Sequence, residues 1–282
     1  MYIDTHSKET MEHSICDYLS ISIHELNFML EKASRAASES TFFNCVTFDG
    51  IINEFIIQHL PEKQIDEILF FHLGRRLNDA QKNYDGNNLF NLLTTENVFS
   101  SFLKDHKVTF IPKDGHLQIY YKNELVSLDK TYETNVPYLR SRLGYNKGRE
   151  DYCFNGFAFK DILYKNSYAR ELYDVPEFIG VLATFLNKDK IGTDYFKNSK
   201  YYCYEYCLPI ENVLFDNDEK MSLESKKIYI VNQVLHRLHY YLYSDITYMN
   251  DDDNPVLRLK DDEILNNMFF VNMEEVTYDM LL

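Results

Sequence analysis

The apolar periodicity of the chain changes at Glu67, and this change limits the architectures that the sequence can adopt. Up to residue 60, apolar residues recur three and four positions apart, which is typical of amphipathic helices. From Glu67 onward, short apolar or alternating segments separated by turn residues indicate strands. Helices and strands do not alternate regularly, so the sequence predicts an α+β fold and not a doubly wound parallel sheet.

The helical part is expected within residues 12–60. Ser22 and Glu25 have the spacing of a capping box, which opens a helix with the apolar face Ile23, Leu26, Met29 and Leu30. A second amphipathic run covers 51–60 and stops at Pro61. Further helices are expected at 175–186 and, as a long amphipathic helix near the C-terminus, at 222–244. The predicted buried seam of that long helix is Ile228, Val231, Leu235, Leu238 and Leu242.

An irregular, mostly antiparallel sheet is expected in the middle of the chain. The candidate strands are 67–73, 107–111, 116–121, 124–128, 152–159 and 200–210. Lys122–Asn123 lies between two of them and predicts a two-residue hairpin turn. We therefore expect a single α+β domain over 1–282, with a helical subregion at 1–62 and an acidic segment at 245–282.

The charge of the chain limits the classes of partner that it can bind. The 282 residues carry 29 basic and 44 acidic side chains, a net charge of −15. The segment 245–282 holds ten acidic residues against Arg258 and Lys260. Such a surface repels phosphate backbones, so nucleic acid is not expected as a general ligand, whereas a protein with a basic surface is. The 23 tyrosines favour a protein interface as well.

The cellular setting is predicted from cysteine usage and composition. Five scattered cysteines do not form a disulfide framework, and no window approaches 18 uncharged apolar residues. The N-terminus has no apolar signal-peptide core. We therefore expect a cytoplasmic protein without a membrane span. Many aromatic, Asn and Lys residues indicate an AT-rich genome, such as that of a low-GC bacterium or one of its phages.

The stretch EILFFHLGRRLND (67–79) is the strongest candidate for chemistry. A histidine at the end of a buried strand is positioned to face a cleft, and guanidinium groups bind phosphates with two hydrogen bonds. His72, Arg75 and Arg76 therefore indicate an anion-binding site. The alternative is a histidine in the core with two surface arginines. His236 and His239 are spaced like metal ligands, but no acidic or cysteine partner follows the spacing, so no metal site is expected.

Three segments resemble ADP-ribosyltransferase-like toxins over residues 67–216. EILFFHLGRR is similar to the first element of that family, YCFNGFAF (152–159) to the second and YCYEYCLPIENV (202–213) to the third. The His-Gly-Thr type of signature after the first strand is absent, and Leu73–Gly74–Arg75 stands in its place.

The resemblance implies an NAD site. His72 and Glu205 would be catalytic, Arg75 and Arg76 would bind the cofactor, and Tyr152 or Phe157 would flank the nicotinamide. A carboxylate at Glu205 would stabilise the positive charge that develops on the ribose when nicotinamide leaves.

Two functions from different classes follow. The first is a toxin-type ADP-ribosyltransferase acting on a macromolecular target in bacterial or phage conflict. The alternative is a non-enzymatic acidic binding protein, such as a phage-encoded inhibitor of a host defence complex. A structural or assembly protein is a third hypothesis.

Overall fold

The computed structural model describes residues 1–39, 42–59, 62–80, 83–129, 135–146, 151–244, 247–250 and 253–282. The chain divides into two compact units. Unit 1 comprises Met1–Phe71, Phe157–Ser167 and Cys207–Leu257, and unit 2 comprises His72–Gly156, Tyr168–Tyr206 and Arg258–Leu282. The predicted helical subregion 1–62 lies within unit 1. The predicted acidic segment 245–282 is divided between the units, and its residues 245–246 and 251–252 lie outside the described residues.

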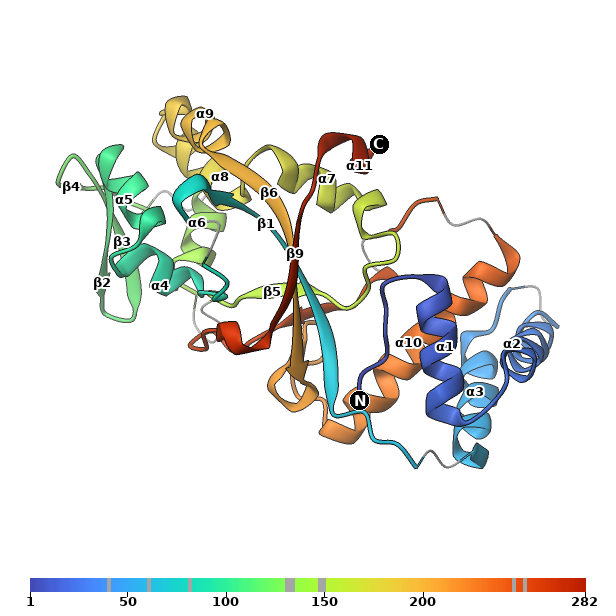
Figure 1. The fold of residues 1–282 in the computed structure, drawn as a ribbon. Coiled ribbons are helices and arrows are strands. Elements are labelled where there is room, and N and C mark those ends of the chain that lie inside the picture. Colours follow the sequence, from blue (N-terminus) through green and yellow to red (C-terminus); the bar gives the residue numbers. More distant parts are fainter. Residues whose placement is uncertain are drawn as a thin grey trace. The chain divides into compact units, whose positions relative to one another are not determined.

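The fold is α+β, with a helical N-terminus, a mostly antiparallel sheet and a long helix near the C-terminus, as predicted (Figure 1). The α-helices are α1 (Lys8–Leu19), α2 (Ile23–Ala37), α3 (Cys45–His59), α4 (Leu89–Thr94), α5 (Val98–Asp105), α6 (Val136–Arg142), α7 (Ser167–Asp174), α8 (Glu177–Phe185), α9 (Asp189–Lys197), α10 (Leu223–Tyr243) and α11 (Tyr278–Leu281). The strands are β1 (Glu67–Leu77), β2 (Val108–Lys113), β3 (His116–Tyr121), β4 (Glu124–Leu125), β5 (Asn155–Phe157), β6 (Ser199–Pro209), β7 (Leu214–Phe215), β8 (Val256–Arg258) and β9 (Phe270–Glu275).

Helices α1, α2, α3 and α10 pack together in unit 1 (Figure 1). The Ser22 capping box is confirmed, because the Ser22 hydroxyl accepts from the Glu25 amide and the Glu25 carboxylate accepts from the Ser22 amide. This cap satisfies amides that have no partner inside the helix. The described part of residues 1–62 contains three α-helices, α1 to α3.

The predicted seam of α10 is only partly correct. Val231, Leu235 and Leu238 are buried, but Ile228 is 52% exposed. The buried face is centred about one residue further round the helix, where Ile230 and Val234 lie in the core. A spacing rule finds one apolar stripe, but the neighbouring helices α1, α2 and α3 decide which stripe is covered.

The hydrogen-bonded order of the large sheet is β7-β8-β5-β1-β6-β9. In unit 1, β1 pairs antiparallel with β5 through Phe71 and Phe157. In unit 2, β6 pairs antiparallel with β9, and the register shifts by one residue beside Glu205. The predicted strand at 152–159 is wrong in length, because β5 covers three residues, whereas β1 extends to Leu77, beyond the predicted end at 73.

The small sheet β2-β3-β4 belongs to unit 2. The predicted hairpin turn is confirmed, since Lys122 and Asn123 both have positive φ angles, 53° and 67°. Two consecutive left-handed residues give the turn the twist that antiparallel strands require. β4 contains only two of the five residues predicted for it. Helices α4 and α5 pack against this sheet. The core of this part of unit 2 includes Leu103, Leu117, Ile119 and Leu139.

Candidate functional site

His72 is a neutral side chain within β1. Its Nδ1 donates to the Asn155 carbonyl oxygen at 2.7 Å, and its ring packs on Phe154 with centroids 4.1 Å apart. A carbonyl can only accept, so the hydrogen resides on Nδ1. Burial and the positive charge of Arg76 lower the pKa of His72 to about 3. The ring therefore carries no positive charge with which to bind phosphate at neutral pH.

Arg75 is an internal cross-link of unit 2. Its side chain is 8% exposed, and it donates to the Ser199 hydroxyl at 2.9 Å, the Ser199 carbonyl at 2.7 Å and the Phe196 carbonyl at 3.1 Å. A further bond reaches the Tyr173 carbonyl. These acceptors occupy four of the five N–H donors of the guanidinium group. Arg75 thus satisfies the backbone ends of β6, α7 and α9 and does not present a free fork to a diphosphate.

Arg76 lies on the opposite face of β1, because successive side chains alternate along a strand. Its guanidinium carbon lies 5.1 Å from the centre of the Tyr204 ring. The Tyr204 ring also lies 6.4 Å from the His72 ring. His72, Arg76 and Tyr204 therefore share one face of the sheet, and Arg75 is on the other.

Glu205 is a buried residue of β6, 5% exposed. Its neighbour Tyr204 contacts His72, and Tyr206 contacts Phe154, the residue on which His72 packs. The register of β6 against β9 shifts by one residue directly after Glu205. Glu205 is also six residues along β6 from Ser199, the partner of Arg75, a separation of about 20 Å in a strand.

Tyr152 and Phe157 are both core residues. Tyr152 belongs to the buried core of unit 2, and its backbone N–H donates to Asp261 at 2.8 Å. Phe157 belongs to unit 1, where it lies opposite Phe71 between β5 and β1. Tyr152 and Phe157 thus lie in the cores of different units. NAD binding stays a prediction.

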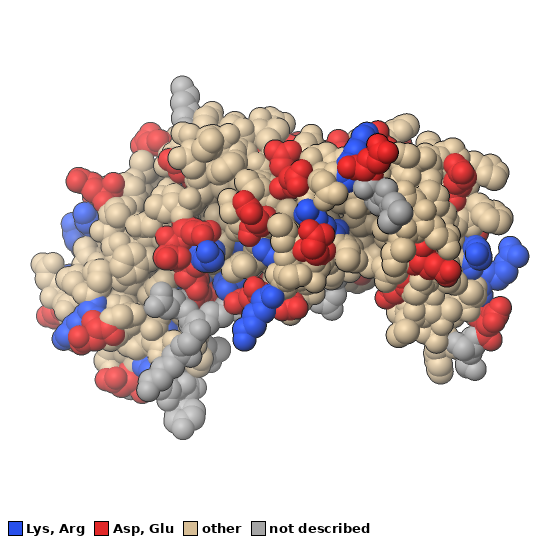
Figure 2. All heavy atoms as spheres, turned by 90° about the horizontal axis from the view of Figure 1, so that it is seen from below, with Lys and Arg blue, Asp and Glu red and all other residues tan. Residues whose placement is uncertain are grey.

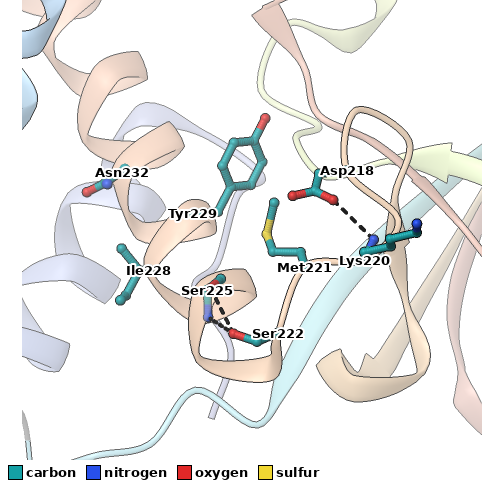
Figure 3. A pocket seen from close by; sticks show the side chains of 8 residues that line it. All are labelled: Asp218, Lys220, Met221, Ser222, Ser225, Ile228, Tyr229 and Asn232. Carbon is teal, nitrogen blue, oxygen red and sulfur yellow. Dashed lines mark hydrogen bonds between the residues drawn. The ribbon is translucent and has the colours of Figure 1, made fainter.

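One open pocket of about 450 Å³ lies beside the start of α10 in unit 1 (Figure 3). Its lining residues are Asp218, Lys220, Met221, Ser222, Ser225, Ile228, Tyr229 and Asn232. Three of these side chains are engaged locally: Ser222 and Ser225 bond each other at the first turn of α10, and Asp218 accepts from the Lys220 amide. The pocket holds no histidine or cysteine that could act as base or nucleophile.

Two further tests concern metals and membranes. Within the described ranges, no three His, Cys, Asp or Glu side chains are grouped so that they could hold a metal ion. None of the helices in the described parts of the chain has the length and apolar character that a membrane span requires.

Helix α3 presents an unusual exposed surface that the sequence prediction missed. Cys45–His59 reads CVTFDGIINEFIIQH and carries apolar side chains on two sides, one of which holds the buried Phe48 and Ile52. On the other side, Val46 is 81% exposed and Ile57 is 67% exposed. This second side extends beyond the single apolar stripe with which a surface helix normally faces the core. We call the exposed stripe Val46, Gly50, Glu54 and Ile57 the α3 surface.

The inner side of α3 is held against α10. The Phe48 ring lies 4.8 Å from His236 and 4.6 Å from His239, measured between ring centres. The Asp49 carboxylate contacts His236 Nε2 at 2.5 Å, and Asn232 donates to Asn53 at 3.2 Å. Because these contacts set the rotation of α3, its outer stripe is presented to solvent by the packing of unit 1 itself.

Gly50 occupies the middle of the α3 surface. Its backbone is helical, and a methyl group added there would meet no described atom within 4 Å. A glycine inside a helix costs about 1 kcal/mol relative to alanine. Neither a turn nor a close internal contact among the described residues requires it. The apolar excess of α3 was visible in the sequence, but its 51–60 segment was interpreted as an ordinary amphipathic helix.

The charge of unit 1 is strongly negative. Its three segments contain 22 acidic and 10 basic residues, so 12 of the 15 net negative charges belong to this unit. Helix α3 contains Asp49 and Glu54 and no Lys or Arg. Figure 2 shows acidic side chains spread over the visible face of the molecule, with basic side chains between them.

Comparison of the chain with protein-family models, with curated proteins and with solved structures finds no match.

Proposed function

We propose that the protein acts by binding another protein through the α3 surface. The observation that carries this proposal is that α3 has a second apolar side, where Val46 and Ile57 are exposed, away from the side on which Phe48 and Ile52 are buried. Exposed apolar side chains that gather on one element mark interaction sites in folded proteins. Phe42 and Phe43, directly before α3, are exposed as well and extend the apolar area.

The proposal corresponds to the binding-protein hypothesis and not to the transferase. Arg75 is engaged with backbone carbonyls, His72 is neutral, and Glu205 lies six residues along β6 from Ser199, the partner of Arg75. The cytoplasmic setting and the conflict between bacteria and phages stay predictions. Within that setting the protein would act as an inhibitor that occupies a surface of its target.

A photo-crosslinking experiment tests the proposal. A benzoylphenylalanine replaces Gln58, which is exposed next to Ile57 of the α3 surface, and in a matched control it replaces His13, an exposed residue of α1. Illumination of cells that produce each chain should give a discrete protein–protein adduct from position 58 and not from position 13. If position 58 gives no more adduct than position 13, the proposed function is wrong.

A further inference from the structure

Gly50 is the starting point for identifying what covers the α3 surface. Val46 lies one turn before it on the same side of the helix, and Glu54 lies one turn after it. The absence of a side chain at Gly50 leaves a notch between Val46 and Ile57. A glycine at such a position lets another backbone approach closely. A partner with a flat surface would make no contact inside the notch.

The negative charge of unit 1 makes binding to the α3 surface more favourable for some partners than for others. A second copy of this chain would bring another unit with 22 acidic and 10 basic residues, and the two would repel each other. A segment rich in Lys and Arg would be attracted instead. Glu54 stands next to the notch and is exposed, so it offers such a segment a charge partner.

We propose that the α3 surface receives a basic amphipathic helix of a partner protein, whose backbone packs against Gly50 between Val46 and Ile57. The inference rests on the proposed protein-binding function and adds the class of partner. Docking of an amphipathic helix on an apolar surface uses contacts at helical spacing, and the spacing of Val46, Gly50, Glu54 and Ile57 provides them.

The test uses a fluorescein-labelled synthetic helix as the probe. One peptide has leucines and a central alanine on one face and lysines on the other, and a second peptide has glutamates in place of the lysines. Fluorescence anisotropy with the full chain should show binding of the lysine peptide that weakens as salt rises. The glutamate peptide should bind at least tenfold more weakly.

Substitutions at Gly50 identify the site. Gly50→Gln fills the notch and should weaken binding of the lysine peptide at least tenfold, and Gly50→Ala should weaken it less while raising the melting temperature. Gly192→Ala is the matched control, because Gly192 is also helical and an added methyl there makes only an ordinary contact, 4.0 Å from Ala183. This control should leave peptide binding unchanged.

Three results would overturn the inference: equal binding of both peptides, binding that is insensitive to Gly50→Gln, or no binding at all. A fourth contradicting result could come from sedimentation velocity. If the chain forms a dimer and Val46→Gln dissociates it, a second copy of the chain covers α3. The crosslink from position 58 separates the two proposals. If it forms while the lysine peptide fails to bind, the partner class is wrong and the proposed function stands; if neither occurs, both are wrong.

Discussion

Asp49 on α3 and His236 on α10 are in direct contact, with Oδ1 and Nε2 2.5 Å apart. The contact lies beside Phe48, which is fully buried between His236 and His239. The polar pair and the aromatic ring together determine which side of α3 faces the core. The exposed stripe of α3 is therefore a consequence of specific packing and not of a loosely attached helix.

Phe48 and Ile57 should respond differently to truncation although they share one helix. Phe48→Ala removes a buried ring and should lower the free energy of unfolding by about 3–5 kcal/mol. Ile57→Ala removes an exposed side chain and should change it by less than about 0.5 kcal/mol. Urea denaturation of both variants measures this difference. Equal losses would mean that the outer side of α3 is buried in the folded protein.

The same comparison applies to α10. Leu235 is buried, and Leu235→Ala should cost about 2–5 kcal/mol. Ile228 belongs to the seam predicted from the sequence, but it is half exposed, so Ile228→Ala should cost less than about 1 kcal/mol. If chemical denaturation shows a large loss of unfolding free energy for Ile228→Ala, Ile228 is buried and the seam predicted from the sequence is correct.

The parts of the fold that depend only on residues close together in the sequence were predictable. The Ser22 cap and the Lys122–Asn123 turn are formed by residues within three positions of each other, so their chemistry is readable locally. The exposure of Ile228 depends on which helices surround α10, and that information is distributed over the whole of unit 1.

The surroundings of Arg75 depend in the same way on residues that are distant in the sequence. Arg75 was predicted as an anion ligand from its sequence neighbours, but its acceptors Tyr173, Phe196 and Ser199 lie about a hundred residues away in the chain. Which face of the sheet carries His72 was not predictable either, since it depends on the pairing partners of β1.

Arg75 should be required for stability and not for cofactor binding. Arg75→Met leaves several buried carbonyls without donors and should lower the free energy of unfolding on the order of 3–5 kcal/mol. Arg76→Met, on the half-buried opposite face, should cost clearly less. Denaturation and NAD titration of both variants test this. Weakened NAD binding by Arg75→Met at unchanged stability would support the transferase instead.

His72 predicts an acid-dependent loss of stability. Its pKa is lowered to about 3 in the folded chain, whereas an unfolded histidine titrates near about 6.5. The neutral ring is favoured by folding, so its contribution is complete above about pH 6.5 and is lost progressively as the pH falls toward 3. The contribution lost by pH 4 is on the order of 3 kcal/mol. The difference in unfolding free energy between the wild type and His72→Phe, measured from pH 7 to pH 4, should shrink or invert with falling pH. A constant difference would show that the ring titrates normally.

The most direct test of the α3 surface is the crosslink from position 58 in a chain that also carries Val46→Gln and Ile57→Gln. Both residues are exposed, so this double variant should keep the wild-type free energy of unfolding within about 1 kcal/mol. It should nevertheless lose the protein–protein adduct, because the apolar contacts of the surface are gone. An undiminished adduct in this stable double variant would contradict protein binding through α3.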